Sequence, residues 1–146
     1  MPAGFRIHYG IVSDDARRED NGKLILIGLY GANINVPTFP VMLVLALTLS
    51  FSCDQPLKEP MVLRASLNGE RIMEAKTVFE SSKIENGMTI MPGLPIRIQK
   101  EGILIFQIRF ESESEWITAA EIPVTSQPTA SEQPSSQFQP GVSRSS

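Results

Sequence analysis

The stretch MVLRASLNGERIMEAKTVF, residues 61–79, decides the fold class because apolar and polar side chains alternate on both sides of an Asn-Gly pair. A period of two is typical of a strand with one buried face. Asn-Gly suits a type I′ hairpin because both central residues need a positive φ. The stretch therefore predicts two antiparallel strands whose inner faces carry Met61, Leu63, Ala65 and Leu67 on one side and Met73, Ala75, Thr77 and Phe79 on the other.

The same signals recur along the chain. Asn-Gly appears again at Asn21-Gly22 and Asn86-Gly87, which predicts repeated antiparallel pairing. Residues 41–51 predict a long central strand with its leucine face covered, and two prolines in MPGLP, residues 91–95, predict an edge or irregular segment. Residues 103–110 alternate once more. The last expected strand has one face formed by Trp116, Thr118, Ala120, Ile122 and Val124.

These patterns together predict an all-β domain over residues 1–124. No long stretch shows the 3.6-residue period of a helix, and about seven to nine strands are typical of a two-layer antiparallel β-sandwich. Beyond Val124 the chain is rich in Ser, Gln and Pro, with Phe138 as its one aromatic residue. We expect residues 125–146 to be a disordered tail. The tail is either a docking peptide centred on Phe138 or a solvated end with no specific role.

Composition excludes several classes of function. The 146 residues carry a net charge of -3 with scattered cations, so no nucleic-acid partner is expected. Residues 24–53 lack charge, but Asn33, Asn35, Pro37 and Pro40 interrupt them, so no membrane span is expected. A single cysteine, Cys53, and the absence of an apolar signal segment at the start favour a reducing, cytoplasmic location.

The glycine-rich stretch NGKLILIGLYG, residues 21–31, invites comparison with phosphate-binding loops. A P-loop needs a glycine five positions before Gly-Lys and a serine or threonine after it, but Arg17 and Leu24 stand there. Strand residues and prolines, rather than a helix, follow Gly28 and Gly31. We interpret these glycines as positions where a strand bends, bulges or lets another backbone approach closely.

Catalytic and metal-binding patterns are equally weak. His8 is the only histidine and lies in an alternating run, so a strand histidine is its simplest interpretation. Cysteine and histidine pairs at zinc-ligand spacing are absent. The acidic residues of SDDARREDNG, residues 13–22, are interspersed with arginines and fit a solvated turn better than a calcium site. We expect no catalytic residue, cofactor or metal, although paired carboxylates of the glycosidase type stay open among Glu111, Glu113 and Glu115.

The order of these features resembles a bacterial domain family of unknown function composed of small cytoplasmic β-sandwich proteins. The resemblance covers residues 5–124, and its most specific parts are Gly22-Lys23 with Ile27-Gly28, and Phe39-Pro40 before the long strand. It implies an immunoglobulin-like sandwich and brings no activity or catalytic residue. The chain departs from the family pattern around SSKIENGMTIMPGLP, residues 81–95.

Two functional hypotheses from different classes follow. The first is a non-catalytic interaction or assembly module that binds a protein partner or itself, with Met88, Ile90 and Met91 as exposed candidates near the proline-broken edge.

The second hypothesis is a small-ligand or carbohydrate-binding sandwich. Trp116 or Tyr30 would supply a stacking platform, and Asn33, Asn35 and Arg109 would supply polar contacts. A core position is the favoured interpretation of Trp116, because it alternates in phase with Ile122 and Val124. A hydrolase is the third and weakest hypothesis.

Overall fold

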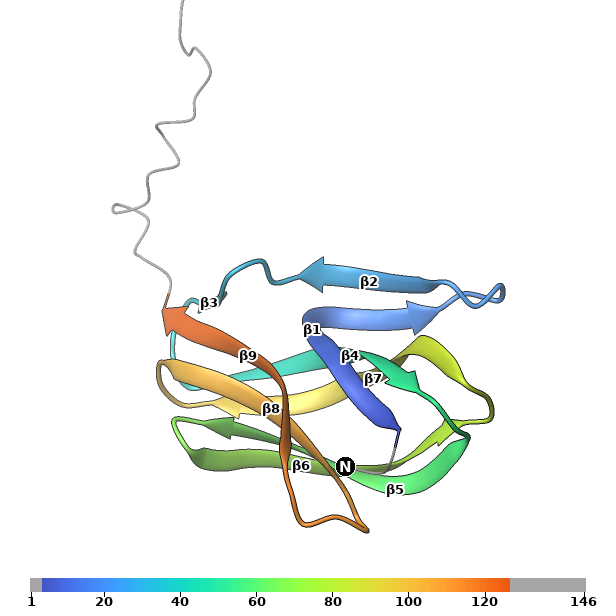
Figure 1. Ribbon diagram of the computed structural model, residues 1–146. Coiled ribbons are helices and arrows are strands. Elements are labelled where there is room, and N and C mark those ends of the chain that lie inside the picture. The colour runs from blue at the N-terminus through green and yellow to red at the C-terminus, as the bar shows by residue number, and fades with distance from the viewer. Residues whose placement is uncertain (1–3, 127–146) are drawn as a thin grey trace, which may run out of the picture.

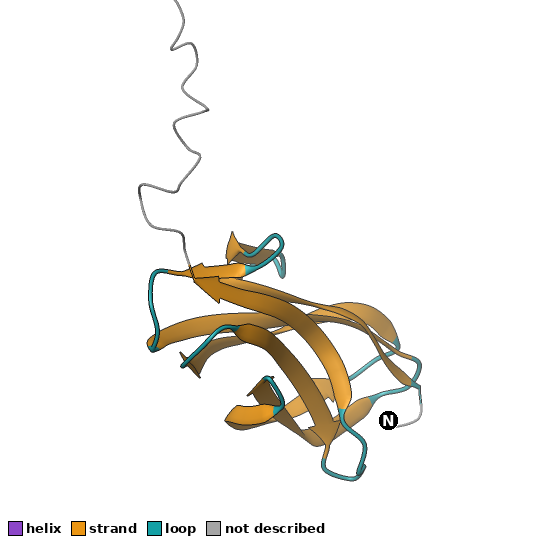
Figure 2. Cartoon of the chain, turned by 90° about the vertical axis from the view of Figure 1, so that its left-hand side faces the viewer, coloured by secondary structure: helices purple, strands orange, loops and turns teal. Residues whose placement is uncertain are grey.

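The computed structural model describes residues 4–126, which form nine strands in two curled sheets (Figures 1 and 2). The four-stranded sheet has the order β2-β1-β4-β7, and the five-stranded sheet has the order β3-β9-β8-β5-β6. The strands are β1 (Phe5–Arg18), β2 (Leu24–Leu29), β3 (Ile34–Val36), β4 (Val41–Cys53), β5 (Leu57–Leu67), β6 (Glu70–Ser81), β7 (Glu85–Ile98), β8 (Gly102–Phe110) and β9 (Ile117–Ser126). The all-β prediction is confirmed.

The expectation of purely antiparallel sheets is wrong for the second sheet, which is mixed. β3 pairs with β9 in parallel, with Ile34 opposite Val124. Antiparallel pairing is dictated only where a tight turn joins neighbouring strands, and β3 reaches β9 by crossing from the other sheet. β9 also continues to Ser126, two residues beyond the expected domain boundary. The rest of the predicted tail, Phe138 included, lies outside the described residues.

The core lies between the inner faces of the two sheets. The predicted leucine face of β4 is confirmed, since Leu45, Leu47 and Leu49 are almost completely buried. β4 pairs with β1 on one side and β7 on the other, which makes it a central strand. Across the interior, β8 contributes Phe106 and Ile108, both fully buried. Full burial of large side chains from both sheets supplies the main stabilising term of the fold.

Two of the three Asn-Gly pairs form turns. Asn68 and Gly69 have φ values of 52° and 84° and join β5 to β6 as predicted. The third pair does not form a turn: Asn86 and Gly87 lie inside β7, opposite Ser52 and Phe51 of β4. Gly87 lets the Phe51 ring pack closely against the backbone of β7, because a Cβ at this position would lie 3.1 Å from Cζ of that ring.

The last strand contains an irregularity that the alternation of its sequence concealed. The β8–β9 register shifts where Phe106 faces Ala120 and the adjacent Gln107 faces Thr118. Ala119 is the extra residue, and it is buried. Because a bulge inverts the inside–outside phase of the residues before it, Trp116 is not part of the core, although Ile122 is buried as expected.

Candidate functional site

β1 changes its pairing partner at Ser13. Residues before this point pair with β4, and Ser13 itself lies opposite Ala46 of β4 and Leu29 of β2. After Ser13, β1 pairs only with β2, and Figure 1 shows β1 bending to run beside that strand. Residues 14–18 and 24–29 thus form a two-stranded extension, which we call the β1–β2 ribbon.

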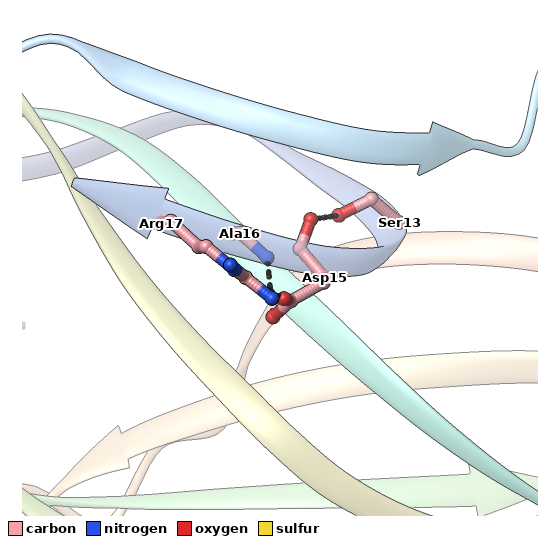
Figure 3. Close-up of polar contacts among 4 residues, drawn as sticks. All are labelled: Ser13, Asp15, Ala16 and Arg17. Atoms are coloured by element: carbon pink, nitrogen blue, oxygen red, sulfur yellow. Dashed lines mark hydrogen bonds and ion pairs between the residues drawn. The ribbon is translucent and has the colours of Figure 1, made fainter. Parts of the chain in front are cut away.

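Local hydrogen bonds fix the bend (Figure 3). The Ser13 hydroxyl donates to the carbonyl oxygen of Asp15 at 3.0 Å, and the Asp15 carboxylate accepts from the Ala16 N–H at 2.9 Å and from Arg17 Nε at 2.8 Å. The bond from Arg17, followed by that from the Ala16 N–H, holds the pKa of the Asp15 carboxyl below its usual value. Ser13 is fully buried, so its hydroxyl depends on this internal acceptor.

The loop end of the ribbon is tied to the body of the domain. The predicted turn at Asn21-Gly22 is a three-residue loop, in which the Gly22 N–H donates to Glu19 O at 2.9 Å and Gly22 takes a φ of 89°. Arg18 then donates from Nη2 to the carbonyl oxygen of Met88 on β7 at 3.2 Å. β1 and β7 therefore touch although β4 separates them in the sheet, so the ribbon folds back over its own sheet.

The other end of the ribbon is held by Tyr30 and Asp14. The Tyr30 hydroxyl donates to the Asp14 carboxylate. Burial, and then the hydrogen bond to Asp14, raise the pKa of Tyr30 to about 12. Gly28 has a φ of 71°, and a Cβ there would lie 2.3 Å from an Asp14 carboxylate oxygen. The prediction that Gly28 marks a bend or a close approach is confirmed.

The exposed side of β2 is apolar. Ile25, Ile27 and Leu29 are 40%, 45% and 59% exposed, and their β1 neighbours in register are Arg17, Asp15 and Ser13. The alternate position of β1, Ala16, is only 2% exposed and lies opposite the half-buried Leu26. The ribbon thus presents one face to the domain and one row of branched apolar side chains to solvent.

Four strands lie at sheet edges, and β2 differs from the other three. Natural edge strands are usually kept from pairing with other chains by shortness, by prolines or by charges. β3 has only three residues, and β7 contains Pro92 and Pro95. β6 carries Arg71, Glu74, Lys76 and Glu80. β2 has six residues, LILIGL, with none of these protective features, and within residues 4–126 it pairs only with β1.

The predicted partner-binding residues of β7 are half-buried rather than exposed. Ile90 and Met91 line a hollow of about 370 Å³ between β6 and β7, together with Ala75 and Pro92. The carbonyl oxygen of Met88 accepts the hydrogen bond from Arg18 of the ribbon. The expectation that β7 is an edge strand is confirmed.

The residues predicted for a small-ligand site fall into separate groups, with Arg109 beside Trp116 and Asn33 beside Asn35. Trp116 lies directly before β9. The Arg64 guanidinium is 3.8 Å and that of Arg109 is 5.2 Å from its ring centroid. The amide of Asn33 donates to Asn35 and to Thr125 near the other end of β9, both at 2.9 Å. Trp116 and Thr125 are nine positions apart in the chain, which corresponds to about 30 Å of extended strand.

The structure also places the residues considered for catalysis and metal binding. His8 is exposed on β1, beside the register shift between Ile7 and Tyr9. Cys53 is buried, and burial raises the pKa of its thiol. The part of the chain that the structure describes contains no cluster of three or more His, Cys, Asp or Glu side chains suited to a metal ion. Among residues 4–126, no helix has the length and apolarity needed to cross a membrane.

Sequence reasoning included Tyr30 and Met88 among the candidate residues but missed the exposed row on β2. The signal available in the sequence was the composition of LILIGL. A strand with one solvated face normally alternates apolar and polar residues, and this strand does not. An unbroken apolar run suggests a strand covered on both faces. Here the run instead lies at an edge, with every second side chain exposed.

Comparison with known proteins identifies a family without an assigned role. A search of curated proteins finds no match. The model of the family described as "Family of unknown function (DUF6941)" matches residues 8–127, which include the β1–β2 ribbon and nearly the whole described domain. The chain therefore belongs to this family of unknown function, DUF6941.

Proposed function

We propose that the domain is a non-catalytic protein-interaction or assembly module that accepts an additional strand on the free edge of β2. The observation that carries this proposal is the contrast among the four edges: β2 is an uncharged six-residue edge with Ile25, Ile27 and Leu29 exposed, whereas the others are short, charged or broken by proline.

Strand addition would use the chemistry that β2 offers. An extended partner segment gains main-chain hydrogen bonds from an unpaired edge, and its alternate side chains pack on the apolar row. A two-stranded ribbon is by itself only marginally stable in water, whereas three or more strands with an apolar face are stable. A partner strand would therefore complete the sheet that the bend in β1 leaves narrow at this point.

Affinity capture with quantitative mass spectrometry tests this function. The bait is the full chain, and the extract comes from cells that natively encode it. The Ile27→Lys variant places a charge in the centre of the exposed row. Val78→Lys is the matched control, since Val78 is a β-branched residue on the charged edge strand β6 that is at least as exposed as Ile27. Wild type and Val78→Lys should enrich the same protein, which Ile27→Lys should lose. Equal capture by all three baits would contradict the proposal.

The proposal also includes the expected fold relationship and cellular location, and it leaves a small-ligand site as the weaker alternative. Two sheets enclosing one apolar core support an immunoglobulin-like relationship, and a lone, buried Cys53 supports a bacterial cytoplasmic setting. A carbohydrate or other small-ligand site at Trp116 has weaker support, because the Arg64 guanidinium already covers one face of the indole ring.

A further inference from the structure

We infer that the strand added to β2 is the β2 strand of a second copy of this chain, paired antiparallel about a twofold axis. This inference rests on the proposed function and names its partner. In a twofold interface the same surface of each copy must be complementary to itself. The strand LILIGL meets this condition because it carries no charge that would face its own copy.

The apolar row defines the register. Side chains directly opposite in an antiparallel pair lie on the same face of the sheet, so the exposed row of one copy must meet the exposed row of the other. A twofold axis through Ile27 places Ile27 opposite its counterpart and Ile25 opposite Leu29 of the second copy. Every member of the row, at 40% to 59% exposure in the single chain, then gains an apolar neighbour.

Charge at the two ends of β2 favours the antiparallel orientation over the parallel one. Lys23 immediately precedes the strand, and Asp14 lies beside its other end, held by Tyr30. Antiparallel pairing brings the lysine end of each copy to the Asp14 end of the other, whereas parallel pairing would superimpose like ends. Glu19 and Asp20 of the loop, and Arg17 and Arg18 of β1, also lie near the lysine end, so the charge term orients the pair more than it stabilises it.

The structure leaves room for this arrangement. Figure 1 shows β2 at the rim of the molecule with no strand beyond it. Met42 and Val44 of β4 are also exposed, at 54% and 58%. The fully buried Ala46 and Ser13 separate them from Leu29 in the strand register, so the exposed row on β2 stands apart from them. Six residues of paired strand make a small interface, so we expect a dissociation constant in about the micromolar range.

The test measures mass in solution by sedimentation velocity over a range of micromolar concentrations, using the full chain. Wild type and Val78→Lys should reach the dimer mass as concentration rises. Ile27→Lys and Ile27→Glu should each weaken self-association by about a hundredfold or more, because like charges would meet across the twofold axis. Circular dichroism checks that each variant keeps the wild-type strand content.

Mixing the two charged variants tests the register. Ile27→Lys and Ile27→Glu should form a heterodimer with each other, because the charges that oppose pairing in each variant alone attract in the mixture. Failure of the mixture to associate would overturn the register about Ile27. Dimers of Ile27→Lys as tight as those of wild type would place the contact elsewhere and overturn the inference.

The sedimentation and capture experiments together distinguish self-pairing of β2 from strand addition by another protein. A wild-type chain that stays monomeric, yet captures another protein in an Ile27-dependent manner, would overturn self-pairing and leave strand addition standing. A monomer that captures nothing would overturn both.

Discussion

Tyr30 connects the chemistry of a single residue to the position of the ribbon. Its hydroxyl donates to Asp14, which follows directly after the bend at Ser13, while Tyr30 itself follows the end of β2. The bond therefore holds the two strands of the ribbon together at the end opposite the loop. Breaking it should loosen the edge that we propose as the docking surface.

Titration of Tyr30 tests this contact. Its pKa is raised from 10.0 to about 12, so below pH 10 the phenol is protonated in both the folded and the unfolded chain. Between pH 10 and 12 the unfolded chain loses this proton while the folded chain keeps it, so this residue's contribution to stability is lost as the pH rises through that window. In a Tyr9→Phe background, ultraviolet absorbance of the phenolate should show a midpoint near 12.

Asp14→Asn supplies the comparison for that titration. Removing the negative charge should lower the Tyr30 midpoint toward the ordinary value, while the burial of the ring should keep it above that value. A Tyr30 midpoint that does not change in Asp14→Asn would contradict the hydrogen bond between Tyr30 and Asp14.

At the scale of elements, the two sheets come into close contact where β1 passes β9. Gly10 lies on β1, and a Cβ at this position would be 2.4 Å from the backbone oxygen of Ala119. The neighbour is backbone, which cannot move aside as a flexible side chain can. Gly10 therefore marks a position where the fold requires the absence of a side chain.

Gly10→Ala should lower the free energy of unfolding by about 1–3 kcal/mol, because the added methyl group forces β1 and β9 apart. Gly31→Ala is the matched control, since a Cβ there meets nothing within 4 Å, and it should be neutral or stabilise by about 0.4–1 kcal/mol through the unfolded chain. Urea unfolding followed by tryptophan fluorescence measures both. Equal losses in the two variants would show that the β1–β9 contact is not tight.

Strand positions could be predicted from the sequence where a local turn and strict alternation agreed. The hairpin at Asn68-Gly69 meets both conditions, and most of its predicted inner face is buried. The prediction is wrong for Thr77, which is exposed, and it missed Val62, which is buried on the opposite face. The prediction failed where tertiary contacts override local pattern. Asn86-Gly87 is a strong turn signal, but the Phe51 ring and pairing with β4 hold these two residues inside a strand. Trp116 is out of phase with the buried residues of β9 because of the extra residue of a bulge, and a bulge leaves no mark in the sequence.

The candidate site was less predictable than the fold. An uncharged run such as LILIGL reads as interior, and whether it lies at an edge depends on strand order, which neighbouring residues do not encode. The change of partner at Ser13 is equally hidden, because the residue that fixes it is a serine bonded to a carbonyl two positions later. Edge strands are decided by the topology of the whole chain.

At the scale of the whole molecule, four phenylalanines join the two sheets. Phe5 and Phe51 come from the sheet that contains the ribbon, and Phe79 and Phe110 come from the other. Ring centroids of Phe79 lie 5.1 Å from Phe5, 4.9 Å from Phe51 and 6.0 Å from Phe110. These are edge-to-face contacts, which add to the gain from burial.

Phe79 contacts all three of the other rings from β6, an edge strand that does not pair with β7 of the other sheet. Because no ladder of hydrogen bonds joins β6 to β7, side-chain packing must hold the two sheets together here. Phe79→Ala should therefore lower the free energy of unfolding by about 3–5 kcal/mol. The adjacent Val78 is 55% exposed, so Val78→Ala should change it by no more than about 1 kcal/mol. Urea unfolding at protein concentrations low enough to keep the chain monomeric measures both, and a similar small loss in each would mean that the sheets are held together elsewhere.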